Sequence, residues 1–150
     1  MKIRDIITGQ THTCTPETEL RRVAAMMVEH DCGAIPVVGE GAKAAPLGIV
    51  TDRDIVARSL ARGEDPEALS ARDAMTSNPV TVARDEDLER AMELMQEHQV
   101  RRLLVVDEAD NLAGVLSLAD VVRATPDRRA ARTVEGVSQP SSDASGPAPA

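Results

Sequence analysis

One segment of this sequence occurs twice, and the repeat limits the folds that the chain can adopt. With a shift of 68 positions, Asp5 aligns with Asp73 and Val37 aligns with Val105. After the stretch "GEGAKAAP" the shift becomes 66, so the first copy carries two extra residues in this stretch. Its Gly, Ala and Pro residues predict a turn, where a change of length costs little free energy. We therefore expect two structural units of the same kind.

Each copy predicts the same order of elements. The runs "THTCT" and "PVTVA" predict a first strand. A helix then begins near Pro16 or near Asp85, because Pro and carboxylates favour the first turn, and apolar residues follow at helical spacing. Two strands come next, "AIPVV" with "LGIVT" and "RLLVV" with "LAGVLS", and a second helix follows Thr51 or Ser117. The predicted unit is β-α-β-β-α, written twice.

The repeats divide the chain into four segments. The first repeat spans 1–62, a linker spans 63–71 and the second repeat spans 72–125. Residues 126–150 are rich in Pro, Ser, Ala and Gly and almost without large apolar side chains, so they cannot bury enough surface to offset their ordering entropy. We therefore expect a disordered C-terminal tail.

Charge and composition exclude several functions. The net charge of −8 and the pI near 4.9 argue against nucleic-acid binding, because phosphate backbones require a basic face. Phe, Tyr and Trp are absent, which removes the usual platforms for stacked bases. No run approaches the ~18–20 apolar residues of a membrane span, and the N-terminus lacks a secretion signal. We therefore expect a cytoplasmic protein without a nucleic-acid or membrane partner.

The cysteines and histidines show no metal-ligand spacing, so we expect no metal site. Cys14 aligns with Val82, and Cys32 aligns with Val100, which favours thiols that act as small buried hydrophobic groups. A redox pair is the alternative, although a reducing cytoplasm disfavours it. No histidine is spaced as the partner of a nucleophile, so nothing indicates an enzyme.

The pattern G-x-x-[ST]-x-x-D ends both copies and has two readings. As structure, Thr51 caps a helix and Asp54 lies at its third position, a close variant of the capping box. As function, the same carboxylate accepts both hydroxyls of a ribose beside a helix N-terminus that favours phosphate. The two readings do not exclude each other. Ser117 and Asp120 occupy the same positions in the second copy.

Two tandem units that begin "RDIIT" or "RDAMT" and end in G-x-x-[ST]-x-x-D resemble a pair of CBS domains, the Bateman module, over about residues 3–125. Segments such as "EHQVRRLLVVD" resemble small stand-alone bacterial members of the hypoxic-response type. The resemblance implies an α/β (α+β) fold in which two CBS repeats pack with pseudo-two-fold symmetry. It also implies a regulatory homodimer that binds AMP, ADP, ATP or S-adenosylmethionine between the repeats and is not an enzyme.

The two implied clefts differ in charge. Arg101 and Arg102 precede a strand of the second copy, where the first copy has Gly33 and Ala34. Arginine forks bind phosphate, and in the family basic residues here reach the nucleotide held by the other repeat. The alternative is a solvated edge that pairs with acidic residues. The resemblance implies one ligand-binding site made of Thr51, Asp54, Pro79, Val80, Arg101 and Arg102.

The mirror-related site lacks these arginines and is expected to be weaker, empty or suited to a less charged ligand. It would consist of Thr11, His12, Ser117 and Asp120. The leading prediction is a sensor that holds an adenine nucleotide reversibly, without a tightly bound cofactor, and signals to another protein. The alternative is a ligand-free interaction or redox-responsive module in which the motifs only cap helices.

Overall fold

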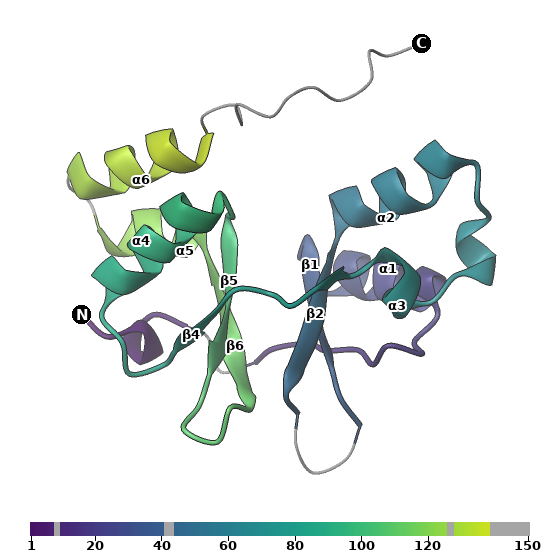
Figure 1. Ribbon diagram of the computed structural model, residues 1–150, viewed down its shortest axis with the longest axis horizontal. Helices are drawn as coiled ribbons and strands as arrows, with labels where there is room; N and C mark the ends of the chain where they lie inside the picture. Colours follow the sequence, from purple (N-terminus) through teal and green to yellow (C-terminus); the bar gives the residue numbers. More distant parts are fainter. Residues whose placement is uncertain (8–9, 41–43, 126–127, 139–150) are drawn as a thin grey trace.

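The computed structural model describes residues 1–7, 10–40, 44–125 and 128–138. Figure 1 shows two halves side by side, each with a three-stranded sheet and its own helices. The predicted α/β fold with two related units is confirmed. The helices are η1 (Ile3–Asp5), α1 (Leu20–Glu29), α2 (Asp52–Arg58), η2 (Leu60–Arg62), η3 (Pro66–Ala68), α3 (Ala71–Ala74), α4 (Leu88–His98), α5 (Leu118–Ala124) and α6 (Arg128–Ser138).

The first sheet has the order β1-β2-β3, with strands β1 (Ala34–Val38), β2 (Pro46–Thr51) and β3 (Thr76–Ser77). All neighbouring strands are antiparallel. Ile35 pairs with Val50, and both side chains are fully buried against the helices. The strand predicted from "AIPVV" is therefore exact, and the one from "LGIVT" begins one residue earlier.

The second sheet has the order β4-β5-β6, with strands β4 (Thr81–Ala83), β5 (Arg102–Val106) and β6 (Leu112–Ser117). Strand β4 is parallel to β5, and β6 is antiparallel to β5. In the first copy the predicted strand "THTCT" is wrong, because only Cys14 forms an isolated parallel bridge, to Val37. The equivalent pair in the second copy, Val82 with Val105, lies within a three-residue strand pairing.

The two halves exchange their opening segments. Ile3 is fully buried in the core formed mainly by α4, β5 and β6. Conversely, Ala71 and Ala74 of α3 are buried in the core formed by α1, β1 and β2. The Ala71 N–H donates to the Thr18 carbonyl at 2.8 Å, which fixes α3 to the first half. Each packed half therefore contains the opening segment of the other sequence repeat, and this exchange joins the halves.

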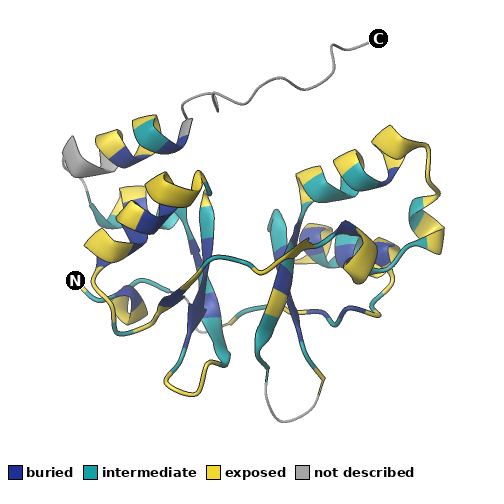
Figure 2. Cartoon of the chain, in the orientation of Figure 1, coloured by how far each residue is buried: buried dark blue, intermediate teal, exposed yellow. Residues whose placement is uncertain are grey.

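Both cores consist of aliphatic and methionine side chains, with Cys14 added in the first, in a chain without aromatic residues. Buried residues line the strands and the helix sides that face them (Figure 2). The largest fully buried side chains include Leu20 and Ile35 in the first core and Met95 and Leu103 in the second. Each half thus has its own hydrophobic core.

Helix α6 corrects the expectation of disorder from residue 126 onward. Residues 128–138 form a helix that packs on α4 and α5, with Thr133 and Val137 buried. The Gln96 side-chain amide lies 3.3 Å from the Thr133 hydroxyl, and the Gln99 amide donates to the Gly136 carbonyl at 2.7 Å. The composition misled because a short helix needs few apolar residues when a neighbouring surface already exists. Residues 126–127 and 139–150 lie outside the described residues.

Candidate functional site

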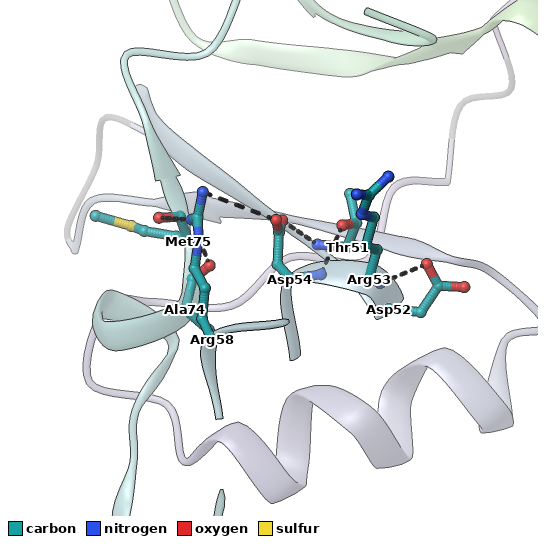
Figure 3. Close-up of polar contacts among 7 residues, drawn as sticks. All are labelled: Thr51, Asp52, Arg53, Asp54, Arg58, Ala74 and Met75. Atoms are coloured by element: carbon teal, nitrogen blue, oxygen red, sulfur yellow. Dashed lines mark hydrogen bonds and ion pairs between the residues drawn. The ribbon is translucent and has the colours of Figure 1, made fainter. Parts of the chain in front are cut away.

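The motif at Thr51 caps helix α2. The Asp54 N–H donates to the Thr51 hydroxyl oxygen at 3.1 Å, and the Thr51 N–H donates to a carboxylate oxygen of Asp54 at 2.9 Å (Figure 3). These two bonds satisfy backbone donors that the first helical turn leaves without partners. The predicted capping role of this motif is therefore confirmed.

The cap leaves part of the Asp54 carboxylate available. Its second oxygen lies 3.9 Å from the Arg58 guanidinium, beyond hydrogen-bond distance, and its side chain is 17% exposed. Arg58 itself donates to the carbonyls of Ala74 and Met75 at 2.8 and 2.7 Å (Figure 3). Arg58, from the first repeat, therefore anchors the end of α3, which belongs to the second repeat. It also stays close to Asp54. No sequence pattern indicated a role for Arg58.

A cavity of about 1160 Å³ lies beside the Thr51 cap, between the two halves. The first repeat contributes strand β2 and the start of α2, and the second contributes β5, α5 and the segment before β4. The structure brings together all the residues predicted for the first site, namely Thr51, Asp54, Pro79, Val80, Arg101 and Arg102. A volume of this order accommodates a small molecule such as a nucleotide.

The charge of this cavity is opposite to that of the chain. Four arginines, Arg53, Arg101, Arg102 and Arg123, line it together with two aspartates, Asp52 and Asp54. Within the described part of the chain, the side chains of Arg101 and Arg102 form no hydrogen bond or ion pair, so they are not the acid-paired edge considered above. The arrangement suits an anionic ligand in an otherwise acidic protein.

Several lining residues were not predicted. Asn78 has a left-handed backbone (φ 52°) in the segment between β3 and β4, and Gln99 has the same conformation (φ 53°) at the end of α4. Val134 lines the cavity from α6, which the composition had assigned to a disordered tail. No single-sequence pattern indicated Val134. Asn at a left-handed position before Pro79 is a turn signal that could have indicated Asn78.

A second cleft of about 410 Å³ contains the residues predicted for the weaker site, namely Thr11, His12, Ser117 and Asp120. Arg102 lines this cleft as well as the larger cavity, so the prediction that the second site lacks an arginine is wrong. Two carboxylates, Asp31 and Asp120, accompany it. The second cleft is therefore smaller and, with neutral histidine, carries a net negative charge on its lining.

The Asp120 carboxylate is more heavily bonded than its counterpart in the first repeat. It accepts hydrogen bonds from the Ser117 N–H at 2.8 Å and the Ser117 hydroxyl at 2.6 Å, and it pairs with Arg123. Partial burial opposes its ionisation, but these bonds outweigh burial and hold the pKa of Asp120 below its ordinary value. Asp120 therefore offers fewer free acceptor positions to a ligand than Asp54 does.

Histidines and a cysteine meet near the second cleft. The rings of His12 and His30 stack with centroids 3.4 Å apart, a contact that sequence spacing did not indicate. Cys32 lines the cleft, whereas Cys14 is buried in the first core, where burial raises the pKa of its thiol to about 11. The resulting shortage of thiolate makes Cys14 a weak redox nucleophile.

The described ranges contain neither a cluster of side chains suited to a metal ion nor a membrane-spanning helix. No group of three or more His, Cys, Asp or Glu side chains could hold a metal ion among residues 1–7, 10–40, 44–125 and 128–138. Over the same ranges, no helix has the length and apolar character needed to cross a bilayer.

Known relatives are similar to this chain in sequence. Hypoxic response protein 1 of Mycobacterium tuberculosis is 35% identical over 138 residues, which cover 91% of this chain and 94% of that protein. The uncharacterized protein MK0525 of Methanopyrus kandleri is 34% identical over 123 residues, 82% of this chain and 59% of that longer protein.

Solved structures of CBS domain proteins have a similar fold. The crystal structure of Hypoxic Response Protein I with two coordinated zinc ions superposes with a TM-score of 0.73 at 33% identity, covering 84% of this chain and all of that one. The CBS domain protein PAE2072 of Pyrobaculum aerophilum, complexed with AMP, gives 0.73 at 26% identity and covers 80% and 89%. The family model for the CBS domain matches residues 3–61 and 71–127. This chain therefore belongs to the CBS domain family, as a pair of CBS domains.

Proposed function

We propose that this protein is a regulatory binding module that holds an adenine nucleotide of the AMP, ADP or ATP class in the larger cavity. The observation that carries the proposal is the meeting of Asp54, from one repeat, with Arg101 and Arg102, from the other, in one basic cavity. PAE2072, a relative of the same fold, forms a complex with AMP, which supports this ligand class. S-adenosylmethionine is a further candidate that the same pocket residues could accommodate.

Each part of a nucleotide has a matching group in the cavity. The Asp54 oxygen that the helix cap does not use, which lies 3.9 Å from the Arg58 guanidinium, would accept ribose hydroxyls. Arg101 and Arg102 supply unpaired guanidinium groups for phosphate. The base would lie between aliphatic groups, with Pro79 and Val80 on one side, since the chain has no aromatic residue.

In the proposed mechanism, ligand binding changes the relative arrangement of the two halves. The ligand would contact both repeats, so its binding energy favours the arrangement that brings Asp54 and the arginines together. Such a shift alters the surface that a protein partner meets. No step requires covalent chemistry, and we propose a binding role rather than catalysis.

Calorimetric titration tests this proposal. We expect AMP or ATP to bind the wild type, and Asp54→Ala to weaken binding by about tenfold or more, because a hydrogen bond to a charged group is worth about 1.5–3 kcal/mol. Asp73→Ala is the matched control, since it also removes a capping-box carboxylate, at the start of α3, and lines neither cavity. Equal binding by wild type and Asp54→Ala would refute the site.

The ultraviolet spectrum offers a quick check on the same proposal. Because Phe, Tyr and Trp are absent, a nucleotide retained during purification would absorb near 260 nm with almost no protein background. NAD and S-adenosylmethionine, titrated in parallel, would identify the ligand class. If AMP, ATP, NAD and S-adenosylmethionine all fail to bind, the nucleotide proposal fails.

We further propose that the protein forms a homodimer through α1 and α2. Helix α6 covers α4 and α5, whereas the equivalent helices of the first half expose Val28 and Val56, and the adjoining η2 exposes Leu60, with 84%, 54% and 63% of their surfaces accessible. An apolar surface of this kind favours a second copy as its partner. Sedimentation equilibrium should show a dimer that Val56→Asp weakens. Leu47→Asp, at an exposed strand residue away from these helices, should leave it intact.

A further inference from the structure

Helix α6 packs on α4 and α5 along one side. Among its described side chains, Thr133 and Val137 are buried. The Gln96 amide lies 3.3 Å from the Thr133 hydroxyl, and a Cβ added at Gly136 would lie 3.1 Å from the Gln96 side chain, so α4 and α6 approach closely. A surface helix that packs along one side opens at a lower free energy than the core does.

The same helix forms part of the wall of the larger cavity. Val134, which is 36% exposed, lines the cavity on α6. Gln99 lines it at the end of α4 and also donates to the Gly136 carbonyl at 2.7 Å. One side chain thus contacts α6 and borders the cavity. Figure 1 shows α6 beside α4 and α5 of the second half, and the first half has no such helix among the described residues.

We propose that α6 is a ligand-responsive wall of this cavity. A ligand in the cavity contacts Val134 and Gln99 only when α6 is docked, so it binds the docked state more tightly. By reciprocity, docking of α6 strengthens the ligand, and the ligand stabilises docked α6. The inference rests on the proposed nucleotide site and adds its regulation. The released helix would be the part of the protein that reports an empty cavity.

The test combines binding with hydrogen exchange in the full chain, with AMP as the probe. Val137→Asp places a carboxylate in the buried contact with α4, where it should release α6, and it adds no charge to the cavity lining. Ala131→Asp adds the same charge on the exposed side of α6 and is the matched control. Circular dichroism and urea unfolding establish that both variants keep the folded repeats.

We expect Val137→Asp to weaken AMP binding by about fivefold or more, the lower range of typical coupling between sites, and Ala131→Asp to leave it unchanged. In the wild type, AMP should slow amide exchange across residues 128–138. Undiminished AMP binding by Val137→Asp, or α6 exchange that AMP does not change, would overturn the role of α6 while the nucleotide site stands. A flat AMP titration of the wild type would instead refute the nucleotide site and this inference with it.

Discussion

The two repeats cap their second helices in the same way, yet the clefts beside these caps differ. Thr51 with Asp54 and Ser117 with Asp120 form equivalent capping boxes. The larger cleft has about 1160 Å³ and a basic lining, and the smaller has about 410 Å³ and an acidic one. The shared motif therefore builds the helix start, and the residues that the opposite repeat contributes decide what each cleft can hold.

The carboxylates of the two motifs show the same contrast. Asp120 accepts two hydrogen bonds from Ser117 and pairs with Arg123, whereas Asp54 accepts one bond from Thr51 and has Arg58 only at 3.9 Å. The Asp54 carboxylate therefore keeps more acceptor positions free than the Asp120 carboxylate does. Identical sequence patterns have thus diverged in availability to a ligand.

The largest expected difference between the halves concerns the motif glycines. A Cβ at Gly48 would lie 2.7 Å from the Thr76 backbone oxygen, whereas one at Gly114 would lie 3.2 Å from the flexible Ile7 side chain. Gly48→Ala should therefore destabilise the fold by about 1–3 kcal/mol, in the range typical of overpacking, and Gly114→Ala by less. Urea unfolding measures both. Equal losses would show that the segment beside Gly48, at Thr76, and the segment beside Gly114, at Ile7, pack equally tightly.

The arginines should separate the two clefts by binding. Arg101 lines only the larger cavity, while Arg102 lines both. Arg101→Gln and Arg102→Gln should each weaken AMP by about tenfold at the larger cavity, equivalent to about 1.4 kcal/mol. Only Arg102→Gln should also change a second, weaker binding event in the calorimetric titration. A loss of that event in Arg101→Gln would contradict the assignment of the clefts.

The smallest expected effect concerns the cap of the second repeat. Asp120→Asn should lower the free energy of unfolding at pH 7 by about 1 kcal/mol, as for other lost caps. Because folding lowers the pKa of Asp120, its contribution is present above the ordinary aspartate value of about 3.9 and disappears as the pH falls through the lower folded value. Urea unfolding of both proteins at several pH values tests this. A difference that persists below the folded pKa would contradict it.

Local patterns predicted most strands and caps because these depend on nearby residues, but the start of the first helix near Pro16 is wrong, since α1 begins at Leu20. The run "RLLVV" became β5 with exact bounds, and the spacing of Thr51 and Asp54 became a capping box. The repeat itself aligned Arg101 and Arg102 with Gly33 and Ala34, which led to the contrast between the clefts. These predictions needed only the pattern, the alignment of the copies and the family resemblance.

Features that depend on tertiary contact were not predictable in this way. Helix α6 forms against a surface that α4 and α5 provide, so its own composition was misleading. The stack of His12 on His30 joins a loop to the end of α1, and no spacing indicates it. Arg102 borders both clefts, which a linear alignment of repeats cannot show.

A crystal structure of the protein with AMP would be the most direct test of a nucleotide shared between the repeats. We predict ribose hydroxyls on the Asp54 carboxylate and phosphate on Arg101 and Arg102 of the same chain, with the base beside Pro79 and Val80. AMP bound to residues of a single repeat, or bound outside the larger cavity, would contradict this arrangement.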